Sequence, residues 1–203
     1  MQSRSLYHTA PLASASLWAM TEHPLLSGFV TYLQAALPDA EGVAKLMLGL
    51  PDKVYSDLSQ HLAAELHGPA REPLDVVLTL PDGLKLAERL AEALHLPLVR
   101  VQGQGGAWKI DAQMLLNRHR GLLVSRELIG GVAELEVCVQ AQGLGCEVRS
   151  LACALERSTE QGRHRLLQLG VQPHAAVQIA QVPATAQHSG GWIIERRLPD
   201  GPR

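Results

Sequence analysis

Apolar positions along the chain switch between helical and strand-like spacing. Val54, Leu58, Leu62 and Leu66 recur every four residues, which predicts an amphipathic helix over residues 54–66. A Gly-Pro pair shortly after this run ends the pattern. The first regular element is therefore a helix that buries one face.

A strand, a turn and a helix follow. Residues 74–80 are apolar and rich in β-branched side chains, Pro81-Asp82-Gly83 turns the chain, and residues 84–94 place their apolar side chains on one helical face. The same alternation predicts strands at 97–101, 121–124, 147–155 and 175–180, and helices at 132–142 and 159–169. Residues 190–194 fit either an edge strand or a hairpin arm.

This alternation predicts an α/β fold with a mainly parallel, doubly wound sheet flanked by helices. Such sheets bind ligands outside the carboxyl ends of the strands, where the strand order reverses, so the loops at 80–84 and 125–131 form the candidate site. We expect an N-terminal extension at 1–22 that is a candidate for disorder, one α/β domain at 23–185, and a C-terminal strand and tail at 186–203.

Composition narrows the function classes. The chain has 203 residues, of which 46% are hydrophobic and 19% charged, as expected for a soluble globular protein. Residues 11–20 lack the charged start and cleavage site of a leader, so a cytoplasmic protein is expected. A net charge of −2 and an aromatic content of 3% disfavour nucleic acid as a partner. No apolar stretch approaches the ~20 residues of a membrane helix, so no membrane partner is expected. Cys138, Cys146 and Cys153 lie in apolar stretches without metal-ligand spacing, which predicts reduced core thiols and no metal site.

Residues 122–131 contain the most informative motif. An apolar run, Leu122-Leu123-Val124, leads through Ser125-Arg126-Glu127-Leu128-Ile129 to Gly130-Gly131 and a predicted helix. This layout resembles the phosphoribosyl-diphosphate (PRPP) loop of type I phosphoribosyltransferases, where an apolar strand ends in two adjacent acids before a glycine pair. Other stretches over roughly residues 25–180 resemble the orotate phosphoribosyltransferase and purine-repressor branch of that family: Leu25-Leu26-Ser27-Gly28 with Tyr32-Leu33, Leu74-Asp75-Val76-Val77 with Gly83-Leu84-Lys85-Leu86-Ala87, His95-Leu96-Pro97-Leu98-Val99, and Gly143-Leu144-Gly145-Cys146-Glu147-Val148.

The resemblance implies displacement of pyrophosphate from PRPP by a nitrogen base, but this chain departs from the family pattern. Ser125 and Arg126 stand where two carboxylates would accept hydrogen bonds from the ribose hydroxyls. Arg126 can only donate, and the Ser125 hydroxyl has no formal charge to stabilise a developing cation. In the loop that would surround pyrophosphate, next to Gly83, Pro81 lacks an N–H and Asp82 adds negative charge.

Two features allow different interpretations. Gly130 and Gly131 can hold a phosphate at a helix N-terminus, or can simply form a turn that needs a positive φ. Arg126 can reach a phosphate, although a solvent-exposed pair with Glu127 or Glu134 is the simpler expectation.

We therefore expect a phosphoribosyltransferase-like protein that has lost PRPP-dependent catalysis and acts as a nucleotide- or phosphate-binding regulatory or scaffolding protein. The alternative is an active transferase that joins a nucleobase or orotate to the ribose of PRPP, with atypical ligands. In that alternative Glu127 would bind the ribose, Lys85, Arg100 and Lys109 would bind pyrophosphate, and Mg²⁺ would enter with PRPP. The resemblance also implies a homodimer.

Overall fold

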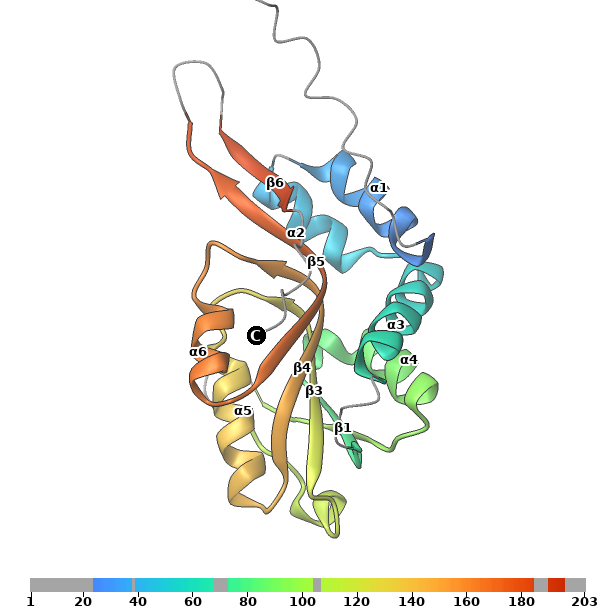
Figure 1. The fold of residues 1–203 in the computed structure, drawn as a ribbon, viewed down its shortest axis with the longest axis vertical. Coiled ribbons are helices and arrows are strands. Elements are labelled where there is room, and N and C mark those ends of the chain that lie inside the picture. The colour runs from blue at the N-terminus through green and yellow to red at the C-terminus, as the bar shows by residue number, and fades with distance from the viewer. Residues whose placement is uncertain (1–23, 38, 68–72, 104–106, 185–189, 196–203) are drawn as a thin grey trace, which may run out of the picture.

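The computed structural model describes residues 24–37, 39–67, 73–103, 107–184 and 190–195 (Figure 1). Its strands are β1 (Val76–Thr79), β2 (Leu98–Arg100), β3 (Arg120–Leu128), β4 (Glu147–Arg157), β5 (Gln172–Val182) and β6 (Gly191–Glu195). Its helices are α1 (Ser27–Ala36), α2 (Ala40–Leu48), α3 (Asp52–Leu66), α4 (Leu84–Leu94), α5 (Val132–Gly143) and α6 (Gly162–Gln168). Short 3₁₀ turns are η1 (Pro24–Leu26), η2 (Pro81–Gly83) and η3 (Ala112–Leu115).

The strands form one six-stranded sheet in the order β2-β1-β3-β4-β5-β6. Pairing is parallel throughout except for β6, which runs antiparallel to β5. The segment at 190–194 is therefore an edge strand and a hairpin arm at once. The chain moves outward from β1 to β2 and then returns to β3 on the other side of β1, so the strand order reverses between β1 and β3. This topology confirms the predicted fold class.

Helices cover both faces of the sheet, with α1–α4 on one side and α5 and α6 on the other (Figure 1). Each side has its own apolar core, because side chains along a strand alternate between the faces. In β3, Leu122 belongs to the first core together with Leu90 of α4, and Leu123 belongs to the second together with Val137 of α5. Helix α4 has the predicted bounds. It ends at His95, which has a φ of 55°.

Some predicted bounds were wrong. The helix expected at 159–169 begins only at Gly162, because the preceding turn is held by bonds from Ser158 N to Ile179 O and from Gly162 N to Ile129 O, both 2.9 Å. Helices α1 and α2 are additions to the predicted elements, and the Asp39 carboxylate caps α2 by accepting from two backbone N–H groups. The extension expected at 1–22 lies outside the described residues.

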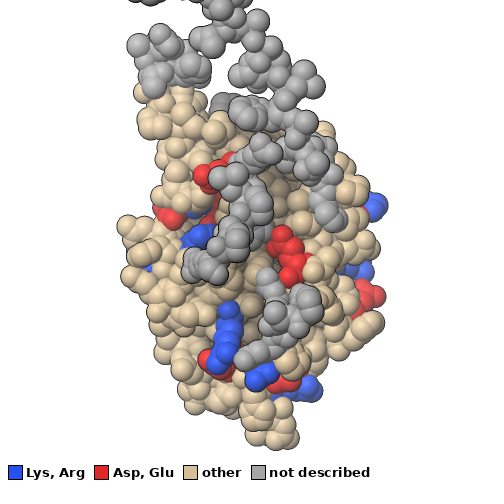
Figure 2. Space-filling model, in the orientation of Figure 1, with Lys and Arg blue, Asp and Glu red and all other residues tan. Residues whose placement is uncertain are grey.

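The three cysteines are buried free thiols, as predicted. Burial raises the pKa of Cys138 to about 12 and that of Cys146 to about 11. On the face drawn in Figure 2, acidic and basic side chains are interspersed among the described residues. Within the described part of the chain, every helix is too short or too polar to cross a membrane.

Candidate functional site at the carboxyl edge of the sheet

The turn after β1 packs directly on the end of β3. Gly83 is buried in η2, and a Cβ at this position would lie 2.8 Å from both the Ser125 Cα and the Val124 carbonyl oxygen. Leu80 N donates to Val124 O at 3.2 Å, which holds the two segments together. The two loops that the sequence places at the candidate site are therefore neighbours at the point where the strand order reverses.

Strand β3 is longer than predicted. We expected it to end at Val124, but it continues to Leu128 because β4 extends equally far and pairs with it, Ser125 opposite Cys153 and Glu127 opposite Leu155. The residues expected in a loop thus belong to the sheet. Their position in the sheet determines which groups their side chains can reach.

Ser125 is fully buried on the α5 side of the sheet. Its hydroxyl makes no hydrogen bond of normal geometry with any residue that the structure describes. The nearest acid is Glu134, in the first turn of α5, whose side chain is also buried. Desolvation raises the pKa of Glu134 and the negative charge of Asp82 adds to the rise, whereas the residue's own backbone N–H and the nearby Ser125 hydroxyl lower it. A carboxyl group thus lies at the N-terminus of α5, the position at which the sequence allows a bound phosphate.

Arg126 lies near a tyrosine and an acid rather than in a surface ion pair. The expected pair with Glu127 or Glu134 is not formed, and its Nε atom is buried without a hydrogen bond to any described residue. Its positive charge lowers the pKa of Tyr55 and of Asp82, while desolvation, the larger effect for both groups, raises them. Although Asp82 keeps part of its surface in solvent, the surrounding protein is dense enough to disfavour its charge.

Glu127 is bound inside the protein. Its carboxylate accepts a hydrogen bond from Arg157 Nε at 2.6 Å, and the two side chains are 9% and 15% exposed. The Arg157 guanidinium also lies 5.0 Å from the ring centre of Trp192 in β6, within the range of a cation–π interaction.

The predicted basic residues do not gather at one point. Lys85 Nζ lies 3.7 Å from Asp52 and 5.8 Å from the centre of the Tyr55 ring, close to the group around Arg126. Arg100 ends the edge strand β2 and pairs with Glu88 at 2.8 Å on the surface of α4. Lys109 is exposed, and its backbone pairs with that of Gln102.

Gly131 has a conformational reason to be glycine. Its φ is 72°, and a Cβ would lie 2.9 Å from the Cα of Gly162 at the start of α6. The carbonyl oxygen of Gly130 accepts from Arg165 of α6 at 2.5 Å. The glycine pair therefore lets α6 pack against the turn before α5, whether or not a phosphate also binds there.

A buried network beside this turn was not recognised in the sequence. Glu156 at the end of β4 is almost fully buried and accepts two bonds of 2.6 Å from Arg163 and one of 2.8 Å from Gln178. The segment from Glu156 to Glu160 has the sequence pattern of a capping turn, and nothing in the sequence separates that interpretation from an ion pair between Glu156 and α6. At the carboxyl end of β4, the Glu156 carboxylate is therefore bonded to other side chains of the protein.

The β3 end offers few oxygen ligands for a cation such as Mg²⁺. The side chains there are a buried hydroxyl and a guanidinium, and the two nearby carboxyl groups are those of Asp82 and Glu134, whose pKa values desolvation raises. Within the described ranges, no group of three or more His, Cys, Asp or Glu side chains is placed to hold a metal.

The sheet order, the flanking helices and the turn at the β1–β3 junction define a type I phosphoribosyltransferase fold, and comparison with solved structures confirms it. An adenine phosphoribosyltransferase from Thermoanaerobacter pseudethanolicus is 21% identical, with a TM-score of 0.55, over 62% of this chain and 80% of that chain. An APRTase from Giardia lamblia complexed with 9-deazaadenine is 13% identical, with a TM-score of 0.56, over 66% of this chain and 83% of that chain.

A third similar structure is adenine phosphoribosyltransferase from Saccharomyces cerevisiae, which is 15% identical, with a TM-score of 0.51, over 60% of this chain and 78% of that chain. No protein-family model and no curated protein sequence matches the chain. At these identities the similarity establishes the fold alone.

Proposed function

We propose that this phosphoribosyltransferase-fold protein does not transfer phosphoribosyl groups and acts as a nucleotide- or phosphate-binding regulatory or scaffolding protein. The observation that carries the proposal is the ion pair between Glu127 and Arg157, in which the remaining acid next to the degenerate dyad is buried and already bonded. A ribose would have to displace a charged partner at 2.6 Å to reach this carboxylate.

Binding of an anion is supported by Arg126. A guanidinium Nε that is buried without a partner among the described residues has lost water without gaining a bond, so a bound phosphate oxygen would restore that bond. Lys85 lies on the same side, beside Tyr55, and can add a second positive charge. We therefore place the phosphate group of the ligand between Arg126 and Lys85.

The alternative of an active transferase needs Glu127, Lys85, Arg100 and Lys109 to act on one substrate. Glu127 is bonded to Arg157, and Arg100 is directed to Glu88 on the surface of α4. If each lost ligand supplied ~1.5–3 kcal/mol through a charged hydrogen bond, the loss of several would reduce the rate by orders of magnitude. These contacts favour the non-catalytic proposal.

The direct test is pyrophosphate release from PRPP and Mg²⁺ with orotate, adenine, guanine, xanthine or uracil. We expect none above the rate without protein. Calorimetric titration of the full chain with nucleoside monophosphates should give saturable binding. Turnover with any base contradicts the loss of catalysis, and absence of binding contradicts the nucleotide site.

A substitution of Arg126 tests where the nucleotide binds. Arg126→Gln should weaken nucleoside monophosphate binding by roughly tenfold or more, as expected for loss of one charged hydrogen bond. Arg89→Gln is the matched control, because Arg89 is a half-exposed arginine in α4 that pairs with Glu92. Equal affinities of both variants and the native chain would remove Arg126 from the site.

We also propose a homodimer, because proteins with the family's loops usually pair through the face that carries them. Light scattering of the full chain over a range of concentrations gives the molar mass. A monomer at every concentration would contradict this part of the proposal.

A further inference from the structure

An acidic side chain lies beside the position proposed for the phosphate. Gly83 of η2 packs so closely on β3 that a Cβ there would lie 2.8 Å from the Ser125 Cα. Asp82 precedes Gly83 and Arg126 follows Ser125, so this contact brings a carboxyl group and a guanidinium to the same part of the β1–β3 junction. A phosphate bound at Arg126 therefore meets the carboxyl group of Asp82 as well.

The Asp82 carboxyl group is drawn in two directions. Desolvation raises its pKa, and this effect exceeds the lowering by the Arg126 charge and by the backbone N–H groups of Arg126 and Gly83. Backbone N–H groups in a turn are also the donors that a phosphate uses. The carboxyl group thus competes with an anionic ligand for the same positive end of the junction.

Carboxyl groups outnumber cations around Asp82. The elements packed about the turn contribute these titratable or charged groups: Asp52 and Tyr55 of α3, Lys85 of α4, Arg126 of β3 and Glu134 of α5. Desolvation raises the pKa of Tyr55 above its usual value of 10.0, so its hydroxyl stays neutral. With Asp82 included, three carboxyl groups lie near two cations, and a phosphate dianion would add further negative charge.

Asp82 is the acid best placed to relieve this repulsion by taking up a proton. Its side chain keeps part of its surface in solvent, whereas Glu134 is buried in the first turn of α5. A negative charge bound at Arg126 disfavours the Asp82 carboxylate further. Because linkage is reciprocal, protonation of Asp82 strengthens binding of the anion by the same factor.

We propose that the phosphate of the ligand binds at Arg126 together with one proton, which is shared between a phosphate oxygen and the Asp82 carboxyl group. Asp82 is then the residue that selects the protonation state of the ligand: it disfavours the phosphate dianion and favours the dianion plus a proton from solvent. This inference rests on the proposed function and adds the form in which the ligand binds. Affinity should therefore fall as the pH rises.

The test measures how affinity depends on pH, with adenosine 5′-monophosphate (AMP) as the probe. Calorimetric titration of the full chain at pH 6, 7 and 8 should show affinity falling by up to about tenfold per pH unit, as expected for uptake of one proton. The second pKa of a phosphate ester is about 6, so AMP is mainly a dianion at pH 8. Titrations at pH 8 in buffers of different ionisation enthalpy should therefore count close to one proton taken up.

Asp82→Asn is the deciding variant. The amide is uncharged and can donate a hydrogen bond to a phosphate dianion. Binding at pH 8 should therefore be at least tenfold tighter than in the native chain, and it should no longer weaken as the pH rises. If Asp82→Asn fails to fold, Asp82→Ser removes the same charge and takes its place.

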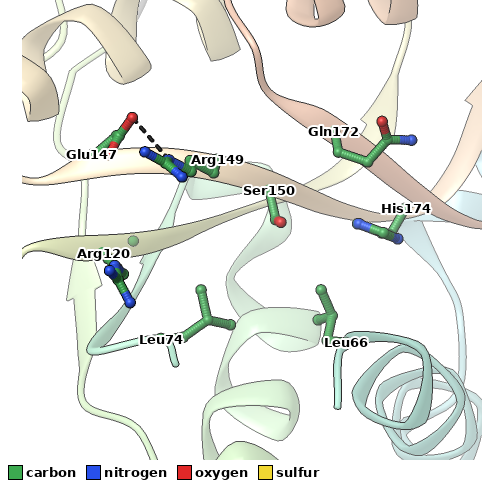
Figure 3. A pocket seen from close by; sticks show the side chains of 9 residues that line it. Leu66, Leu74, Arg120, Glu147, Arg149, Ser150, Gln172 and His174 are labelled. Carbon is green, nitrogen blue, oxygen red and sulfur yellow. Dashed lines mark ion pairs between the residues drawn. The ribbon is translucent and has the colours of Figure 1, made fainter. Parts of the chain in front are cut away.

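Glu147→Gln is the matched control, because it removes one negative charge at the opposite edge of the sheet. Glu147 is half-exposed and pairs with Arg149 at 2.9 Å beside a cavity of about 370 Å³ at the amino ends of β3, β4 and β5 (Figure 3). It lies opposite Arg120, and Arg120 is six residues from Arg126 along β3, or roughly 20 Å at ~3.3 Å per residue. This variant should follow the pH profile of the native chain.

Three results would overturn the inference and leave the proposed function intact, since AMP would still bind. They are a native affinity that does not change with pH, a proton count near zero, and an Asp82→Asn profile equal to that of the native chain. Absence of AMP binding at every pH, in the native chain and in both variants, would overturn the proposed function and this inference together.

Discussion

From the ion pair between Glu127 and Arg157 we predict that replacing Glu127 lowers the stability of the fold. Glu127→Ala leaves the Arg157 guanidinium buried and unpaired, which costs about 3 kcal/mol in the free energy of unfolding. Urea denaturation followed by far-ultraviolet circular dichroism measures the change. If Glu127 instead remained free for a ribose, its removal would cost little stability.

The matched control is a pair on the surface. Glu88→Ala removes the partner of Arg100, where both side chains are at least 48% exposed, so the unfolding free energy should change by less than about 0.5 kcal/mol. A large loss in the control would show that the cost does not depend on burial.

From the raised pKa of Glu134 we predict how stability depends on pH. Because desolvation raises its pKa in the folded chain, the ionised form is disfavoured there, and stability is lost as the pH rises from the usual glutamate pKa of 4.5 through the raised value. Glu134→Gln should therefore stabilise the protein near neutral pH by on the order of 1 kcal/mol, or about 2–4 °C in Tm. The gain should shrink as the pH falls below 4.5.

Glu136→Gln, on the same helix, serves as the control for the removal of one negative charge. Thermal denaturation of both variants and the native chain at several pH values gives the comparison. A gain for Glu134→Gln that is the same at all pH values would mean that its cause is not the ionisation of the buried carboxyl.

At these positions the sequence gives the residue types but not their bonding partners or their burial. The chain shows Ser125 and Arg126 where the resemblance implies two acids, and weak ribose binding is the expectation drawn from them. The partner of Glu127 is not visible, because Arg157 is thirty positions away and reaches it only through the pairing of β3 with β4. Burial of Ser125 and Glu134 likewise depends on where α5 packs.

At the scale of elements, the packing of η2 on β3 depends on one glycine. Gly83→Ala places a Cβ 2.8 Å from the backbone of β3, so the turn must move, and we expect a loss of about 2 kcal/mol in unfolding free energy together with weaker nucleotide binding. Chemical denaturation and calorimetry measure the two effects.

Gly143→Ala is the comparison, because a Cβ at the end of α5 meets no atom within 4 Å. It should leave binding unchanged and stabilise the protein by up to about 1 kcal/mol, since alanine is the better helix former. Equal destabilisation by both variants would contradict the steric argument.

Periodicity predicts elements well where local signals define both ends. Helix α4 follows the turn at Pro81-Asp82-Gly83, and its apolar face runs from Leu84 to Leu94, so its bounds are found from the chain alone. Strand β3 has no local stop after Val124, and its end is set by the length of its neighbour β4. Tertiary pairing decides such boundaries, and a single sequence does not encode it locally.

At the scale of the molecule, the sheet predicts an order of amide exchange. Strands β3 and β4 are central and covered on both faces, whereas β6 is paired on one side only. We expect the slowest hydrogen exchange in β3 and β4 and faster exchange in β6, measured by mass spectrometry or NMR. Slower exchange in β6 than in β4 would contradict this distribution of stability.

The whole-molecule architecture was predictable because strands and helices alternate and the glycine turn resembles a known loop. The position of the candidate site at the β1–β3 junction also followed, since it depends only on where the strand order reverses. The cavity at the amino ends of β3, β4 and β5 was not predictable, because the bulge beside it at Arg149 arises from the pairing of β3 with β4.

The three buried thiols have a practical consequence for studying the intact fold. A thiolate is the reactive form, and burial keeps Cys138, Cys146 and Cys153 protonated and out of reach, so alkylating reagents should modify them only when the chain opens. Cys138 is on α5, Cys153 is in the middle of the sheet, and Cys146 precedes β4. The order in which these sulfurs become labelled would therefore record which layer of the protein separates first.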